Sequence, residues 1–296
     1  MEKGKLGLDD IRDTVMKHHM SRILAECERA RSAVGTWQTR AFFDCLMSND
    51  RYLDIDCNAL LVDLFARIER HLSVPFSHSQ TRGLLRDFWP ISPAAVEKVK
   101  KGMTLEVPLE RALALKNGWH CQFALLSGYN REAHSDKRKS IDLVVEHSES
   151  TAFLIELKEW GCEQHILFAA IEIIMNWYCF IIVRSIDNLK ASDKVRGRWP
   201  KYTDFKLRVM APDKYFDTNG DSSRLIERLS IGLKAFSNTL APKYDVESCE
   251  LGIEKLHLSK QGFIDMVKAN STVLSSKDSG VHELMNSELL RVILEC

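Results

Sequence analysis

Two short apolar runs, separated by a polar turn, carry three charged residues whose types and spacing suit chemistry. The stretch SIDLVVEHSESTAFLIELKEW places Asp142 in the first run and Glu156 and Lys158 in the second. Two carboxylates supply the hard oxygen ligands that a divalent cation prefers, and a neighbouring ammonium can orient a water or help to deprotonate it. Together these groups are the parts needed for phosphodiester hydrolysis.

Strand geometry predicts that the three side chains share one face of a sheet. Successive side chains of a strand alternate between its two faces. We expect a hairpin in which Glu146 lies opposite Ala152, and the same register places Asp142 opposite Glu156 on one side of the sheet. Lys158 follows Glu156 by two residues, so it points to that side as well. Opposed carboxylates repel each other, and bound Mg²⁺ or Mn²⁺ would remove the conflict.

The surrounding elements follow the order α-β-β-β-α-β. A short helix is predicted at Val107–Lys116, ended by Asn117-Gly118. The next predicted elements are strands at His120–Ser127, Ser140–Glu146 and Ala152–Trp160, a helix at Cys162–Tyr178 and a strand at Phe180–Arg184. Beyond them we predict strands at Phe205–Met210 and Cys249–Leu258 and helices at Ser222–Leu240, Gly262–Ala269 and His282–Leu294.

This order, with Asp142 and the run Glu156-Leu157-Lys158, resembles the PD-(D/E)xK nuclease superfamily over about residues 103–184. The resemblance implies an α/β protein with a restriction-endonuclease-like core, a mixed sheet flanked by helices. It implies that Asp142, Glu156 and the backbone carbonyl of Leu157 bind Mg²⁺ or Mn²⁺, and that Lys158 positions the attacking water. The proline of the family motif is absent, since Ile141 stands in its place.

Two further catalytic residues follow from the same resemblance. Many members carry a glutamate on the helix before the strands, and Glu110 fits that place. Some members place a glutamine at the start of the following helix in a QxxxY pattern, and Gln164 fits it with Phe168 in the tyrosine position. From the residues alone, Glu110 is equally well explained as part of a solvated helix face and Gln164 as a polar helix start.

Residues 1–100 are predicted to form a helical N-terminal region, and residues 101–296 the nuclease-like domain with a C-terminal α/β extension. Apolar residues from Ile11 to Leu24 recur at helical spacing, and further helices are predicted at Arg40–Met47, Ala59–Leu72 and Pro93–Lys101. The region carries no recognisable signature. Its helices are available to bind DNA, a partner protein or a second copy in a homodimer.

Composition limits the partners and the compartment. Lys plus Arg and Asp plus Glu are 41 each, which argues against a broad basic surface. None of the eight cysteines forms a CxxC pair, which favours a cytoplasmic protein with reduced core cysteines over a zinc or disulfide protein. The apolar run Ile166–Val183 is interrupted by Glu172 and Asn176, so we predict a buried helix and strand and no membrane span. We expect His165, Glu172 and Asn176 to form the solvent or interface side of that helix.

Nucleic-acid binding by a neutral chain requires local basic patches. One patch, Lys137, Arg138 and Lys139, directly precedes the Asp142 strand. A second lies within residues 184–208 and includes Arg196, Arg198, Lys201, Lys206 and Arg208, interleaved with Trp199 and Tyr202. Arginine suits phosphate, and aromatic rings suit bases or sugars. The alternative for both patches is a solvated loop.

The sequence therefore predicts a Mg²⁺-dependent nuclease that acts on DNA, with RNA not excluded; a role in defence or restriction follows by family analogy alone. A second hypothesis is a binding or regulatory module that keeps the fold and hydrolyses nothing. A third is a helical interaction protein whose charged strands are incidental. In that case Glu156 and Lys158 would be a solvated surface pair, and Asp142 and Glu156 would lie far apart.

Overall fold

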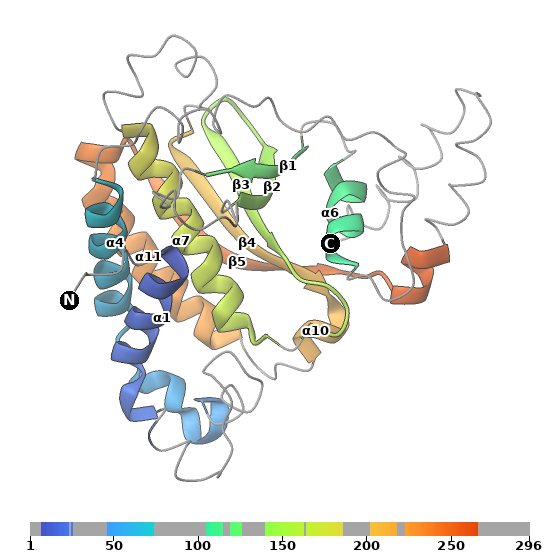
Figure 1. The fold of residues 1–296 in the computed structure, drawn as a ribbon, viewed down its shortest axis with the longest axis horizontal. Helices are drawn as coiled ribbons and strands as arrows, with labels where there is room; N and C mark the ends of the chain where they lie inside the picture. Colours follow the sequence, from blue (N-terminus) through green and yellow to red (C-terminus); the bar gives the residue numbers. More distant parts are fainter. Residues whose placement is uncertain are drawn as a thin grey trace.

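The computed structural model describes residues 7–23, 25, 46–73, 105–114, 119–125, 140–162, 164–185, 202–217 and 223–265. Over this part, the protein is an α/β structure with a five-stranded mixed sheet flanked by helices (Figure 1). The strands are β1 (Trp119–Ala124), β2 (Ser140–Glu146), β3 (Thr151–Leu157), β4 (Asp204–Pro212) and β5 (Ser248–Leu256), in that spatial order. β1, β2 and β3 pair antiparallel, and β3, β4 and β5 pair parallel.

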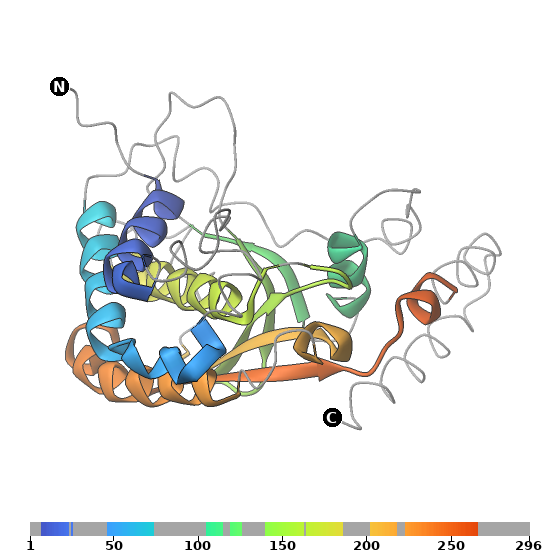
Figure 2. The same cartoon turned by 90° about the horizontal axis from the view of Figure 1, so that it is seen from below.

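Helices cover the sheet unequally. The helices are α1 (Leu8–His19), α4 (Cys57–Leu72), α6 (Glu106–Ala114), α7 (Ile166–Ser185), α10 (Asp213–Asp217) and α11 (Ser223–Tyr244), with a 3-10 helix at Ser48–Asp54 and a helical turn at 260–265. α1, α4, α7 and α11 gather on one side of the sheet, and α6 and the 260–265 turn lie on the other (Figures 1 and 2). The side chains of β3 pack on both faces of the sheet. Leu154 belongs to the core shared with α1, α4, α7 and α11, and Ile155 belongs to the core shared with α6 and the 260–265 turn.

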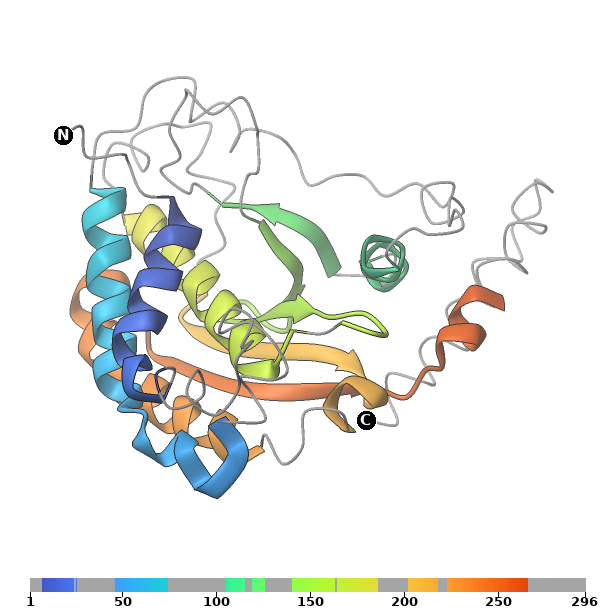
Figure 3. The same cartoon turned by 60° about the horizontal axis from the view of Figure 1, so that its bottom comes forward.

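α7 is the central helix of the larger core. It lies against the sheet, with α1 and α4 outside it (Figure 3). All of its residues are buried except Glu172, Arg184 and Ser185. By length and composition alone, α7 is the one helix in the described ranges that could cross a membrane, and 94% of the relevant window is buried inside the protein.

The predicted strand at Phe180–Arg184 is wrong, because α7 continues unbroken to Ser185. The Phe-Ile-Ile-Val run indicated a strand by composition, but burial on all sides makes β-branched residues equally suitable in a helix. The α-β-β-β-α-β order nevertheless holds, since β4 is the strand that follows α7. The predicted helices Pro93–Lys101 and His282–Leu294 and the boundary near residue 100 lie outside the described residues.

The predicted register of the β2–β3 hairpin is confirmed. Glu146 pairs with Ala152 and Val144 with Leu154, as the alternation argument required. The Ser148 hydroxyl stabilises the turn by accepting a hydrogen bond from the Thr151 N–H at 3.0 Å. Extended by one more pair, this register sets Asp142 against Glu156.

Helices from the N-terminal region share this core. Phe65 of α4 makes edge-to-face contacts with Tyr178 of α7 and with Phe236 and Tyr244 of α11, at centroid distances of 5.1, 5.4 and 5.4 Å. Val15 and Met16 of α1 are fully buried in the same cluster. The described N-terminal helices are therefore built into the side of the sheet that α7 covers, where Glu172 of α7 lies against Lys158.

Candidate active site

Asp142, Glu156 and Lys158 converge at the end of the β2–β3 hairpin. The last recorded pair of the ladder is Leu143 with Ile155, and beyond it the Asp142 carboxylate accepts the Leu157 N–H at 2.8 Å. Glu156 and Lys158 are each 5% exposed. The alternative of a solvated surface pair is therefore wrong. The alternative of distant carboxylates is wrong as well, because the Asp142 charge acts on Glu156.

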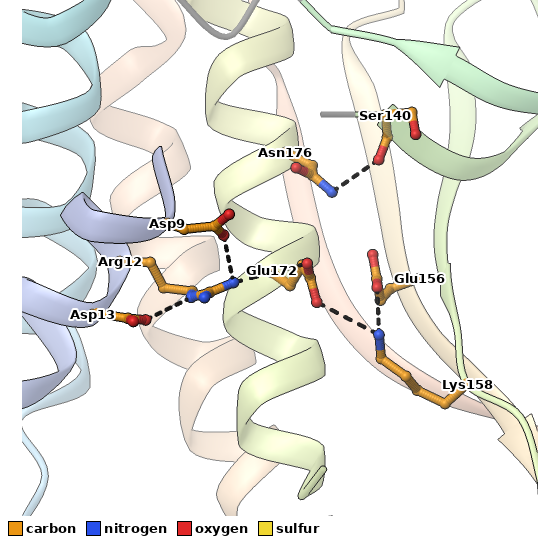
Figure 4. Close-up of polar contacts among 8 residues, drawn as sticks. All are labelled: Asp9, Arg12, Asp13, Ser140, Glu156, Lys158, Glu172 and Asn176. Carbon is orange, nitrogen blue, oxygen red and sulfur yellow. Dashed lines mark hydrogen bonds and ion pairs between the residues drawn. The ribbon is translucent and has the colours of Figure 1, made fainter. Parts of the chain in front are cut away.

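Lys158 lies between two carboxylates from different elements (Figure 4). Its Nζ donates to Glu156 Oε1 at 2.6 Å and lies 3.5 Å from Oε2 of Glu172 on α7. The other oxygen of Glu172 lies 3.8 Å from a guanidinium nitrogen of Arg12 on α1. Arg12 is 5% exposed, pairs with Asp9 and Asp13, and stacks over Phe168 at 4.3 Å. A chain of charges thus runs from β3 through α7 to α1.

α6 adds two more carboxylates to the site. Glu110 is 1% exposed and accepts hydrogen bonds from the Cys121 thiol at 2.9 Å and from the Gln122 amide at 2.8 Å. Glu106 lies one turn earlier on the same helix. Glu159 follows Lys158 directly, and its carboxylate accepts the N–H of Leu105 just before α6 begins. The residue after the Glu-Leu-Lys run therefore ties α6, with its carboxylates, to the end of β3.

Gln122 is held in an unusual backbone conformation beside these groups. Its φ is +52°, a value that non-glycine residues rarely adopt, and it interrupts the β1–β2 pairing at the position facing Asp142. The side-chain Nε2 of Gln122 donates to Glu110, and its side-chain Oε1 accepts from the Ser140 hydroxyl at 2.7 Å. Backbone strain of this kind persists only where surrounding contacts fix it, and it is concentrated at functional sites.

The electrostatics of the site are dominated by excess negative charge. Burial, helped by the Glu110 and Glu106 carboxylates and opposed by Lys158, raises the pKa of Asp142 to about 8. Burial and then the Asp142 and Glu172 carboxylates raise the pKa of Glu156 well above its usual value. Burial alone would lower the pKa of Lys158, but Glu156, Glu172, Asp142 and Glu106 together raise it well above its usual range. The site is thus a buried ammonium surrounded by carboxylates that resist ionisation together.

These donors fit a hard divalent cation. The described residues contain no group of three or more His, Cys, Asp or Glu side chains arranged to hold an ion. Mg²⁺ needs only one or two carboxylates and fills its remaining positions with water and substrate oxygens. Asp142 and Glu156 supply such a pair. Their pKa values are raised first by burial and then by neighbouring carboxylates, and a bound cation would offset both effects. The Leu157 carbonyl as a further ligand stays a prediction.

The structure brings some of the other predicted residues to the site and leaves some outside it. Glu110 reaches the site, since its charge acts on Asp142. Gln164 is half-buried before α7, and no hydrogen bond or ion pair joins it to the described carboxylates. Lys137, Arg138, Lys139, Arg196, Arg198 and Lys201 lie outside the described residues.

The described part of the second basic patch is not an open binding surface. Lys206 and Arg208 pair with Glu250 at 2.8 and 2.5 Å. Arg208 also stacks over Phe153 at 5.4 Å. Tyr202 is 4% exposed, so its ring is unavailable for stacking on bases. These residues contribute to the sheet instead.

The predicted solvent stripe on α7 is also wrong. His165 and Asn176 are 0% and 1% exposed, and Glu172 faces Lys158 and Arg12. Asn176 donates to the Ser140 carbonyl at 3.4 Å, next to the Asp142 strand. A lone charge in an apolar run was the signal that singled out Asp142, and it applies equally to Glu172. Arg12 carried a similar signal, because it falls on the apolar stripe formed by Leu8, Ile11 and Val15.

The raised carboxyl pKa values predict an unusual pH dependence of stability. In the unfolded chain Asp142 and Glu156 ionise near pH 4, whereas in the metal-free fold they hold protons to higher pH, to about 8 for Asp142. Folding takes up protons in this window, so the free energy of unfolding falls as pH rises, by ~1.4 kcal/mol per pH unit for each proton. Urea unfolding in EDTA at pH 5.5, 6.5, 7.5 and 8.5 should show the fall, and added Mn²⁺ should reverse it most strongly at high pH.

Carboxylates elsewhere in the protein do not change its stability between pH 5.5 and 8.5. Hydrogen bonds and charges from Arg67, Lys243 and Arg208 outweigh burial and lower the pKa values of Asp63, Glu69 and Glu250. Their stabilising contribution is lost only as pH falls below about 4.5. A metal-free protein whose stability is constant or rises between pH 5.5 and 8.5 would contradict the prediction.

No match to this chain is found among protein-family models, curated proteins or solved structures.

Proposed function

We propose that this protein is a metal-dependent nuclease that hydrolyses phosphodiester bonds, with DNA as its first substrate class, and that its core is of the restriction-endonuclease-like type. The observation that carries the proposal is the convergence of half-buried Asp142 with buried Glu156 and Lys158 across a hairpin of the required register. A folded protein gains nothing in stability from crowding carboxylates around one ammonium, because their desolvation is costly. Such an arrangement indicates a site that binds a cation.

The residues have distinct roles under this proposal. Asp142, fixed by the Leu157 N–H, and Glu156 would hold Mg²⁺ or Mn²⁺. When bound, the cation supplies Lewis-acid stabilisation of the charge that develops on the scissile phosphate. Lys158 orients the attacking water and offers positive charge beside it. Glu110, which Cys121 and Gln122 hold in place, adds negative charge on the α6 side.

A second function fits the same geometry in one respect. One of the two carboxylate oxygens of Glu156 is already engaged, because Oε1 accepts a hydrogen bond from the Lys158 ammonium at 2.6 Å. A binding module that retains the fold could keep this closed ion pair permanently. The two hypotheses differ in whether a cation opens the pair.

Cleavage assays with the purified full chain test the proposal. Single-stranded, linear duplex and supercoiled DNA, and matching RNA, are incubated with Mg²⁺, Mn²⁺ or EDTA. We expect strand cleavage with Mg²⁺ or Mn²⁺ and none in EDTA, because the buried carboxylates act only through the cation. The order of substrate preference separates DNA from RNA and nicking from end-directed degradation.

A protein that binds Mn²⁺ by calorimetry but leaves every substrate intact would favour the binding module. A protein that neither binds Mn²⁺ nor cleaves would overturn the metal site itself. Glu69→Gln is the matched preparation control, because it removes one carboxylate from a Glu–Lys pair between α4 and α11, away from the site.

A further inference from the structure

Glu156 has two incompatible partners if the proposed function holds. In the structure its carboxylate pairs with the Lys158 ammonium at 2.6 Å, and under the proposed function it would bind a cation. The Lys158 side chain is 6% exposed, so water would hydrate the ammonium poorly if Glu156 released it. A buried ammonium without a counter-charge is strongly destabilising. Cation binding therefore requires a second acceptor for Lys158.

Glu172 already lies where that acceptor is needed. Its Oε2 is 3.5 Å from Lys158 Nζ, within ion-pair distance but longer than the bond to Glu156. A small change in the lysine rotamer would exchange one carboxylate for the other. Glu172 projects from the middle of α7, a helix buried along almost its whole length, so its position is fixed by a rigid element.

Arg12 holds Glu172 from the other side. Its guanidinium lies 3.8 Å from Oε1, so the two oxygens of Glu172 each face one cation (Figure 4). Arg12 is itself fixed by Asp9, Asp13 and the ring of Phe168. The guanidinium is planar and permanently charged, which suits a residue that orients a carboxylate.

We propose that Glu172 is a positioning residue that takes over the Lys158 ammonium when Glu156 turns to a cation, and that Arg12 of α1 holds Glu172 for this exchange. The inference rests on the proposed metal site. It makes the α1 helix a functional part of the site, although α1 contributes no residue that touches substrate. It also assigns a reason for a charged residue in the middle of α7.

Mn²⁺ binding to the full chain, measured by calorimetry, tests the exchange without relying on cleavage. Glu172→Gln removes the second acceptor, so Lys158 competes fully for Glu156, and we expect the affinity to fall about tenfold. Glu172→Asp keeps the charge and should recover most of the loss. The double variant Glu172→Gln/Lys158→Met has no ammonium to compete and should bind at least as tightly as the wild type. Glu69→Gln, which breaks a remote Glu–Lys pair, should bind normally.

Arg12→Gln should weaken binding in the same direction, and the effect should vanish in the Glu172→Gln background because Arg12 acts through Glu172. Arg228→Gln is its control, since Arg228 donates to the carbonyls of Tyr52 and Ile55 away from the site. Melting temperatures verify that each variant is folded.

Three results with the variants would overturn the inference. Wild-type affinity in Glu172→Gln would show that no second acceptor is needed. Equal weakness of Glu172→Gln and its double variant with Lys158→Met would show that Glu172 ligates the ion or supports the fold. If the losses of Mn²⁺ affinity in Arg12→Gln and Glu172→Gln added up in the double variant, Arg12 would not act through Glu172. Mn²⁺ binding without cleavage would overturn only the proposed nuclease function, whereas absence of Mn²⁺ binding in the wild type overturns both.

Discussion

Asp142→Asn should abolish cleavage while raising the stability of the metal-free protein. The asparagine Oδ1 can still accept the Leu157 N–H, so the end of the β2–β3 hairpin keeps its hydrogen bond. The substitution removes one of the two proposed carboxylate ligands of the cation. A loss of several kcal/mol of transition-state stabilisation corresponds to about 10³-fold in rate. Burial disfavours ionised Asp142, whose pKa is raised to about 8, so a neutral amide should add roughly 1–3 kcal/mol to the free energy of unfolding at pH 8.

Single-turnover cleavage and urea unfolding in EDTA measure the two effects on the same preparation. Asp204→Asn makes the same chemical change on β4, where the carboxylate accepts the Ser248 hydroxyl at 2.7 Å, and it should leave cleavage intact. Cleavage that survives in Asp142→Asn would remove the proposed ligand. Loss of both activity and stability would instead indicate a structural carboxylate.

Lys158→Met should also abolish cleavage, but with the opposite effect on stability. Lys158 is the ammonium shared by Glu156 and Glu172, and Asp142 and Glu106 also act on it. Its removal leaves buried carboxylates without their counter-charge, a change that costs about 3–5 kcal/mol in comparable buried pairs. The loss should be greatest at pH 8, where the carboxylates would otherwise ionise, and Mn²⁺ should restore part of it.

Chemical unfolding with and without Mn²⁺ checks this second prediction. Lys243→Met is the comparison, because Lys243 pairs with Glu69 on the surface with a side chain that is 68% exposed, and its loss should cost at most about 1 kcal/mol. Adding Glu172→Gln to Lys158→Met removes one of the stranded carboxylates and should recover some stability. A Lys158→Met protein as stable as the wild type would contradict the reading of the site as a net negative cluster.

The hairpin could be predicted from the sequence because its evidence is local. Alternation within Ser140–Glu146 and Thr151–Leu157, together with the polar turn, permits few registers, and a one-residue slip would move every apolar side chain to the wrong face. α6 and α11 were predicted within a few residues for a similar reason, since both have a clear apolar stripe. The end of α7 could not be predicted in this way, because a helix buried all round has no polar face to mark its period.

The wider site was less accessible to sequence reasoning. The contact between Glu172 and Arg12 and the contact between Glu172 and Lys158 join three different segments of the chain, so the sequence does not reveal them. When the sequence shows no partner for a charged residue in the middle of a helix, the residue is assigned to a solvent-facing side. Glu159 illustrates the same limit, because its role is to hold the start of α6, which lies far away in the sequence.

The contact between Arg12 and Glu172 also bears on when during folding the site becomes complete. It joins α1, which precedes the β2–β3 hairpin in the chain, to α7, which follows it, and the strand that carries Glu156 also pairs with β4. Contacts between such distant segments form late, because a long loop must close before they contribute. A partly made or partly unfolded chain would therefore carry the hairpin without the full charge arrangement around Lys158. If the protein cuts nucleic acid, this order of assembly keeps unfinished chains harmless to the cell that makes them.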